Sequence, residues 1–112
     1  MFKRVVGEGE LASPTAFCPI DDLLFVVEFK PPRITVLDRA DRVVTRLFED
    51  AAAPSKPGWP NAEGPAGEPV RSPTLRPEVL NRPHAIAADS QGNVYLTEWL
   101  IGGRRPKLQC VR

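Results

Sequence analysis

His84 is the residue whose type most directly suggests chemistry, because it is the only histidine among 112 residues. An imidazole can bind a metal ion or act as a general base near neutral pH. His84 follows Pro83 and opens the apolar run "HAIAA". A catalytic zinc site needs three protein ligands, so one histidine cannot form it. The alternative is a histidine at the start of a strand that hydrogen-bonds to a neighbouring loop.

Glu28 and Glu98 are the second candidates, because each ends an apolar run and precedes an aromatic residue, in "FVVEF" and "VYLTEW". A pair of carboxylates could serve general acid–base catalysis. The same acid at the same place in two similar segments is more typical of a structural element. We therefore predict that each glutamate binds loop N–H groups or a nearby arginine, Arg33 or Arg104.

Both acids belong to a pattern that occurs twice along the chain. Short runs rich in β-branched and aromatic residues alternate with turns containing Pro, Asp and Gly, which is typical of an antiparallel meander. In this alignment Thr15 matches His84, and Leu108 matches Ile34. Residues 3–6 resemble the last strand of such a unit. The first unit predicts strands over 16–18, 23–29, 33–37 and 42–48, and the second over 84–88, 94–99 and 107–112.

The run "LLFVVEF" is apolar without alternation, which is typical of a strand buried on both faces. Four-stranded meanders packed face to face on both sides are the blades of β-propellers. We therefore expect an all-β fold, a partial propeller of consecutive antiparallel blades that forms one domain. Its open apolar blade faces are expected to pack against remaining blades or against a second copy. The expected parts are an outer strand of a preceding blade with its link (1–10), a full blade (11–48), a Pro/Gly-rich loop (49–81) and a three-stranded blade (82–112).

The stretch over 49–81 is longer than a link between blades needs. Long connections of this composition are either disordered or functional. One expectation is disorder or loose packing on the surface, and the other is that Trp59 and Pro60 pin the loop or contribute to a binding edge. Arg104 and Arg105, in "LIGGRRP", are expected in a solvated loop, with a rim contact to an acidic ligand as the alternative.

The charge balance argues against two classes of partner. Lys and Arg number 15 and Asp and Glu 14, which gives a net charge of +1, and the basic residues are spread along the chain. We therefore expect no nucleic-acid partner and no binding to an anionic membrane. No apolar run approaches the roughly 20 residues that span a bilayer, and the N-terminus does not resemble a secretory signal. The default expectation is a cytoplasmic protein.

The repeated units resemble a known family. The segments "SPTAF", "DDLLFVVEFKPPRITVLDRADRVV" and "RPHAIAADSQGNVYLTEW" resemble NHL repeats, the blades of six-bladed β-propellers. The matching elements are a Pro-[Thr/His]-Ala opening, an Asp-x-x-Gly-Asn turn and a strand end in Val-Tyr-x-x-[Asp/Glu]. The second unit is most similar to bacterial propellers that resemble the peptidyl-α-hydroxyglycine α-amidating lyases. "QCVR" and Ala85 depart from that pattern.

The resemblance implies the C-terminal two-blade portion of a larger six-bladed protein with a binding or scaffold role, and not an enzyme by itself. The alternative that it implies is part of a metal-dependent lyase-like propeller. In such an intact propeller zinc lies on the axis, held by histidines of several blades, and His84 occupies a matching position. The chain alone is expected to hold no cofactor, because Thr15 at the matching place is a poor zinc ligand. The candidate binding residues are therefore His84, Thr15, Trp59, Arg104 and Arg105.

Overall fold

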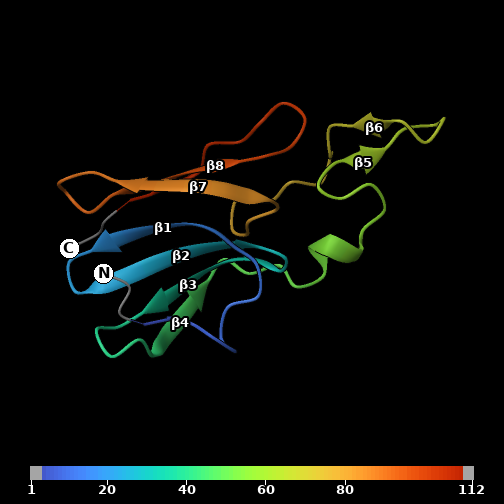
Figure 1. Cartoon of the computed structure of the whole chain (residues 1–112). Coiled ribbons are helices and arrows are strands. Elements are labelled where there is room, and N and C mark those ends of the chain that lie inside the picture. Colours follow the sequence, from blue (N-terminus) through green and yellow to red (C-terminus); the bar gives the residue numbers. More distant parts are fainter. Residues whose placement is uncertain (1–3, 110–112) are drawn as a thin grey trace.

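The computed structural model describes residues 4–109 and shows an all-β chain whose sheets are antiparallel, which confirms the all-β, antiparallel part of the expected fold. The first sheet has four strands in the order β1-β2-β3-β4, each hydrogen-bonded to the next along the chain (Figure 1). Two-residue turns join β1 to β2 and β2 to β3, so this part of the chain is a simple meander. The strands are β1 (Pro14–Ile20), β2 (Leu23–Phe29), β3 (Pro32–Leu37) and β4 (Val43–Leu47).

The second sheet has three strands, β7 (Pro83–Ala88), β8 (Val94–Glu98) and β9 (Lys107–Leu108), in the order β7-β8-β9. Its register corrects one alignment made from the sequence. Leu108 pairs with Val94, just as Leu37 pairs with Leu24 in the first sheet, so Leu108 corresponds to Leu37 and not to Ile34. The longer loop between β8 and β9 shifts the register. The rest of the strand predicted over 107–112 lies partly outside the described residues.

The N-terminal strand predicted over 3–6 is not formed in its described part, since residues 4–6 have no strand geometry and Lys3 lies outside the described residues. A strand requires a hydrogen-bonded neighbour, and no described strand lies beside this segment. Instead, Arg4 forms an ion pair of 2.8 Å with Asp41, and Arg46 donates a hydrogen bond of 2.7 Å to the carbonyl oxygen of Glu10. These contacts hold the N-terminal segment against the end of the first sheet.

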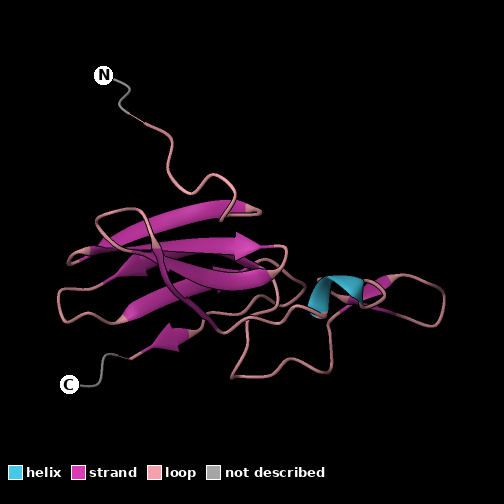
Figure 2. Cartoon of the chain, turned by 90° about the horizontal axis from the view of Figure 1, so that it is seen from below, coloured by secondary structure: helices cyan, strands magenta, loops and turns pink. Residues whose placement is uncertain are grey.

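The segment over 49–81, expected to be disordered or loosely packed, has small elements of its own. These are the 3₁₀ helix η1 (Ala53–Ser55) and the hairpin of β5 (Ala62–Glu63) and β6 (Pro69–Val70). The hairpin projects beyond the ends of the two sheets (Figures 1 and 2). At the base of the segment, Ala53 and Leu80 are buried, and the backbone N–H of Leu80 donates to the carbonyl oxygen of Phe48 at 2.9 Å.

The turn between β7 and β8 is set by Asp89. Its carboxylate accepts hydrogen bonds from the backbone N–H groups of Gln91 at 2.9 Å and Asn93 at 3.0 Å, and Gly92 has a φ of +83°. A positive φ of this kind favours glycine. Hydrogen bonds led by the Asn93 side chain lower the pKa of Asp89 to about 2. The turn chemistry predicted for "DSQGN" is thus present in the structure.

The two sheets pack face to face, and the hydrophobic core lies between them (Figure 1). β1 and β7 are the neighbouring strands across this interface. Leu80, which is 3% exposed, comes from the segment before β7 and fills the space between the sheets. The buried residues of the core are Val27, Ile34, Val36, Leu80, Val94 and Leu96.

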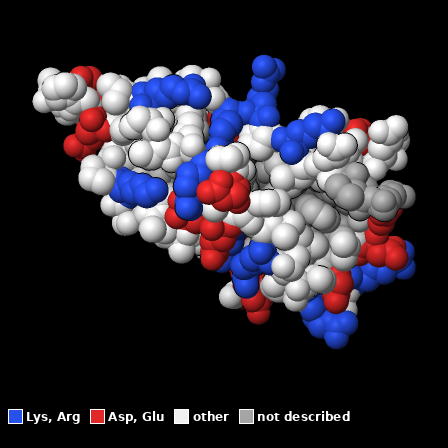
Figure 3. Space-filling view, turned by 180° about the vertical axis from the view of Figure 1, so that it is seen from behind, with Lys and Arg blue, Asp and Glu red and all other residues white. Residues whose placement is uncertain are grey.

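The surface carries both signs of charge without segregation on the face that Figure 3 shows, where Lys and Arg lie among Asp and Glu. This mixed distribution agrees with the spread of basic residues along the sequence. Among residues 4–109 no helix is long and apolar enough to cross a membrane.

Because Leu80 contributes to the core between both sheets, we predict that Leu80→Ala destabilises the whole chain and not one sheet. Truncation of a buried leucine to alanine costs about 2–5 kcal/mol. Urea unfolding followed by far-UV circular dichroism and tryptophan fluorescence should therefore show one transition at lower urea. Val44→Ala is the control, since Val44 is 54% exposed. A change of less than about 0.5 kcal/mol for Leu80→Ala, as for a surface substitution, would show that the sheets do not share a core.

Candidate functional site

Glu28 lies at the end of β2 and is fully buried, with 0% of its surface exposed. One carboxylate oxygen accepts hydrogen bonds from the backbone N–H groups of Ala12 at 2.5 Å and Ser13 at 3.2 Å. The other oxygen accepts from Nε of Arg33 and from the hydroxyl of Thr35, both at 2.6 Å. The side chain therefore joins the segment before β1 to β2 and β3.

Glu98 lies at the end of β8 and has equivalent backbone and arginine partners in the second sheet, without a counterpart of the Thr35 hydroxyl among the described residues. One oxygen accepts from the backbone N–H groups of Asn81 at 2.5 Å and Arg82 at 2.9 Å. The other accepts from Nε of Arg104. The backbone of Arg104 forms the bridge opposite Glu98, as Arg33 is paired opposite Glu28.

These contacts decide what the two acids can do. Burial raises the pKa of Glu28, but hydrogen bonds from Arg33, Thr35 and two backbone N–H groups outweigh burial, so its pKa is lowered. A carboxylate whose acceptor sites are filled by protein donors has little capacity left to exchange protons with a substrate. Both glutamates are thus structural groups that close each unit, and they do not form an acid–base pair.

Thr15 and His84 occupy equivalent β-bulges. The register of β1 and β2 shifts between Pro14 and Ala16, and that of β7 and β8 shifts between Pro83 and Ala85. The structure brings the two bulges together, because the hydroxyl of Thr15 donates to the carbonyl oxygen of His84 at 3.1 Å. The His84 side chain is exposed. Bulges often direct a side chain away from the sheet, and here they expose two of the predicted binding residues at one edge of the interface.

The resemblance to lyase-like propellers implies a zinc ion near His84, so the fit of the neighbouring residues matters. Within residues 4–109 no group of three His, Cys, Asp or Glu side chains could hold a metal ion. The bulge residue next to His84 is Thr15, whose hydroxyl is already bonded to backbone oxygens. The described residues therefore do not fit a zinc site, and no step of a mechanism is derived from one.

The aromatic residues that follow the two glutamates, Phe29 and Trp99, surround an arginine that the sequence did not single out. The guanidinium carbon of Arg82 lies 4.1 Å from the centroid of the Phe29 ring and 4.9 Å from that of Trp99, over both rings. The imidazole of His84 lies 6.5 Å from Trp99. One feature of the sequence distinguishes Arg82: in the alignment of the two units it stands where the first unit has Ser13, directly before the Pro83-His84 bulge.

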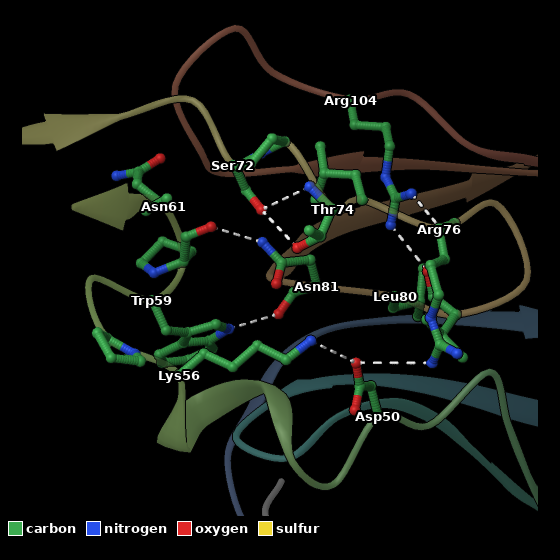
Figure 4. Close-up of a pocket in the computed structure, with 16 residues that line it drawn as sticks. Asp50, Lys56, Trp59, Asn61, Ser72, Thr74, Arg76, Leu80, Asn81 and Arg104 are labelled. Atoms are coloured by element: carbon green, nitrogen blue, oxygen red, sulfur yellow. Dashed lines mark hydrogen bonds and ion pairs between the residues drawn. The ribbon is translucent and has the colours of Figure 1, made fainter. Parts of the chain in front are cut away.

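Trp59 fixes the 49–81 segment to the sheets. Its ring stacks on Phe29 with a centroid separation of 6.4 Å and an interplanar angle of 7°. Its indole N–H donates to the carbonyl oxygen of Asn81 at 2.9 Å, and the Asn81 amide donates to the carbonyl oxygen of Pro60 at 2.7 Å (Figure 4). Since the backbone of Asn81 also binds Glu98, the loop is anchored directly on one of the two buried acids.

A cavity of about 310 Å³ lies within this segment, whose residues form its lining together with Arg104 from the loop between β8 and β9. On its floor Lys56 and Arg76 approach the carboxylate of Asp50 from two sides, at 3.7 and 3.9 Å (Figure 4). Ser72 and Thr74 lie across the cavity, with 3.4 Å between their hydroxyl oxygens. The volume suits a small ligand, but the groups that line the cavity chiefly contact one another and join the loop to the core.

Arg104 lines the same cavity and is committed to the protein. Besides Glu98, its guanidinium donates to the carbonyl oxygens of Arg76 at 2.6 Å and Val79 at 2.8 Å. Its expected place in a solvated loop, or on a rim that contacts an acidic ligand, is therefore wrong for this side chain. Arg105 is exposed and lines a separate depression on the outer face of the second sheet. The five predicted binding residues thus fall into three places, with His84 and Thr15 together.

No family model matches the chain, and neither a curated protein nor a solved structure is found that matches it.

We predict that Glu28→Gln destabilises the fold at neutral pH, by roughly 3 kcal/mol for a buried ion pair that loses one partner. Because the fold lowers the pKa of Glu28, its contribution is complete above the ordinary value of 4.5 and is lost as the pH falls through the lower, folded value. The difference in free energy of unfolding between wild type and Glu28→Gln, measured by urea unfolding, should accordingly become smaller below pH 4.5.

Glu8→Gln is the control for this experiment, because Glu8 is exposed. The control should match the wild type throughout the pH range. A Glu28→Gln chain as stable as wild type at pH 7, or a gap that widens in acid, would be inconsistent with the buried carboxylate described above.

Proposed function

We propose that the chain is an NHL-like β-propeller segment with a binding or scaffold role, part of a larger six-bladed assembly in which further sheets of the same kind pack on its outer faces. The single observation that carries the proposal is an open apolar groove on the outer face of the first sheet. The groove encloses about 580 Å³, with buried Val26 and Leu37 at its floor and Phe17, 68% exposed, at its edge. Exposed apolar surface of this kind is typical of an interaction site.

The relation between the two sheets supports a further sheet as the occupant of the groove. Side chains alternate between the faces of a strand, so Val26 shares one face of β2 with Glu28. Their counterparts in β8, Leu96 and Glu98, lie on the face that packs against the first sheet. The face of the first sheet that carries the groove is therefore equivalent to the face of the second sheet that packs against the first sheet.

The residues at the edge agree with this equivalence. Phe17 pairs with Val26, and Ile86 pairs with Leu96, so Phe17 and Ile86 are counterparts. Ile86 packs against the core between the sheets, whereas Phe17 faces solvent. The first sheet covers Ile86 of the second sheet. A further sheet that packed on the groove in the same orientation would cover Phe17.

The chain also carries a surface that could pack on the groove of another copy, namely the outer face of the second sheet. The outer face of the second sheet exposes Ala85, Ala87, Tyr95 and Thr97. These are mostly small side chains, suited to meet the larger ones of the groove. Because the two faces differ, copies stacked through them form a head-to-tail interface, which closes into a ring or continues as a filament. In the isolated chain the sheet that fills the groove is supplied by a second copy.

The second reading from the sequence, part of a zinc-dependent lyase-like propeller, is favoured by no observation on the described residues. His84 is exposed at the edge of the interface between the sheets, but the residues around it do not complete a set of ligands. We therefore base the proposal on the packing faces and not on chemistry at His84.

Light scattering after size-exclusion chromatography tests the proposal. We predict that the chain has a concentration-dependent mass above its 12.3 kDa, and that Phe17→Asp returns it toward 12.3 kDa, because a carboxylate in an apolar interface is costly to desolvate. Val44→Asp is the matched control, since Val44 is also exposed but does not line the groove. A wild type that stays at 12.3 kDa at every concentration, or equal effects of both variants, would contradict the proposal.

A further inference from the structure

Arg82 is the charged side chain with the least compensated environment near the paired bulges. It is half-buried, and burial lowers its pKa from the ordinary value. Among the described residues no carboxylate forms an ion pair with it. Its one side-chain hydrogen bond there runs from Nη1 to the carbonyl oxygen of Pro83 at 3.5 Å. A guanidinium carries five N–H donors, so most of its donor capacity is unused by the protein.

Two aromatic rings determine where the guanidinium of Arg82 lies. Phe29 and Trp99 both contact Arg82 through their ring faces. Such contacts hold the guanidinium against the two rings without using its N–H groups as hydrogen-bond donors to a carboxylate. The N–H groups of a guanidinium lie in its plane, which is the geometry that can bind a carboxylate through two parallel hydrogen bonds.

An apolar depression lies beside Trp99, one of the two rings that contact the arginine. It encloses about 320 Å³ and is lined by Pro60, Asn61, Trp99, Leu100 and Ile101. Trp99 is 65% exposed and belongs to both features, since it contacts Arg82 and lines the depression. An apolar hollow with a few polar groups near it is the usual combination of a small-molecule site, and Trp99 links the hollow to the charge of Arg82.

We propose that Arg82 anchors a binding site for small organic carboxylates, whose apolar part lies in the depression beside Trp99. The carboxylate supplies the counter-charge that the described part of the chain does not provide. The imidazole of His84, 6.5 Å from Trp99, lies at the edge of this site. The site does not depend on association between copies of the chain, because every group that forms it belongs to one chain.

The test is an NMR titration of the isotope-labelled full chain with benzoate, benzamide and inorganic phosphate. Benzoate combines a carboxylate with an aromatic ring, benzamide keeps the shape without the charge, and phosphate keeps the charge without the ring. We expect saturable shifts of the Trp99 indole N–H and the Arg82 Nε–H with benzoate in the millimolar range. Benzamide and phosphate should each bind about tenfold more weakly or worse, in line with the loss of a charged hydrogen bond or of apolar contact.

Two variants and a control complete the experiment. Arg82→Gln should weaken benzoate binding about tenfold or more, and Trp99→Ala should also weaken it while leaving the fold intact, because Trp99 is largely exposed. Arg105→Gln removes an exposed arginine that lines a different depression, and it should bind as the wild type does. Absence of saturable shifts, equal binding of benzamide, equal binding of phosphate, or unchanged binding by Trp99→Ala would each overturn the proposal. The oligomer mass, measured separately, reports on stacking and not on this site.

Discussion

The structure depends on one repeated interaction, a buried glutamate that accepts two backbone N–H groups on one oxygen and an arginine Nε on the other. Glu28 and Glu98 each occupy this position. A buried carboxylate without partners is costly, whereas one with charged and backbone donors fixes the groups around it. The interaction therefore sets where the chain enters the first strand of each sheet, directly before the bulge at Pro14/Ala16 and at Pro83/Ala85.

The positions of the other notable side chains follow from the same constraint. The N–H groups of Asn81 and Arg82 are fixed by Glu98, which places the Arg82 side chain over Phe29 and Trp99. The side chain of Asn81 in turn contacts Pro60, and its carbonyl oxygen accepts the Trp59 indole. The long loop, the aromatic rings and Arg82 are thus parts of one arrangement that begins at a buried acid.

The sequence predicted the antiparallel strands well, because alternating runs and turns report local backbone preferences that the fold obeys. It also singled out Glu28 and Glu98, since their recurrence is visible as a pattern in "VVEF" and "LTEW". The register of β9 could not be predicted, because loop length and not side-chain type determines it. The strand predicted over 3–6 shows a second limit, since its described part, residues 4–6, stays irregular where no described strand lies beside it.

The binding residues show a third limit of the sequence. Arg104 was a candidate for contact with an acidic ligand, yet its guanidinium is held by Glu98 and two carbonyl oxygens. Arg82 looked unremarkable, yet it is the arginine without a carboxylate partner among the described residues around the bulges. Which arginine is free depends on contacts between the long loop and β8, and such contacts between distant segments leave no periodic signal in the chain.

Native-state hydrogen exchange tests the central claim, that buried glutamates hold the segments before β1 and β7, most directly. The amides to follow are those of Ala12, Ser13, Asn81 and Arg82, which donate to the two carboxylates although none of them lies in a strand. The account predicts that they exchange as slowly as the amides of β2 and β8. Exchange at the rate of exposed loop amides would contradict it.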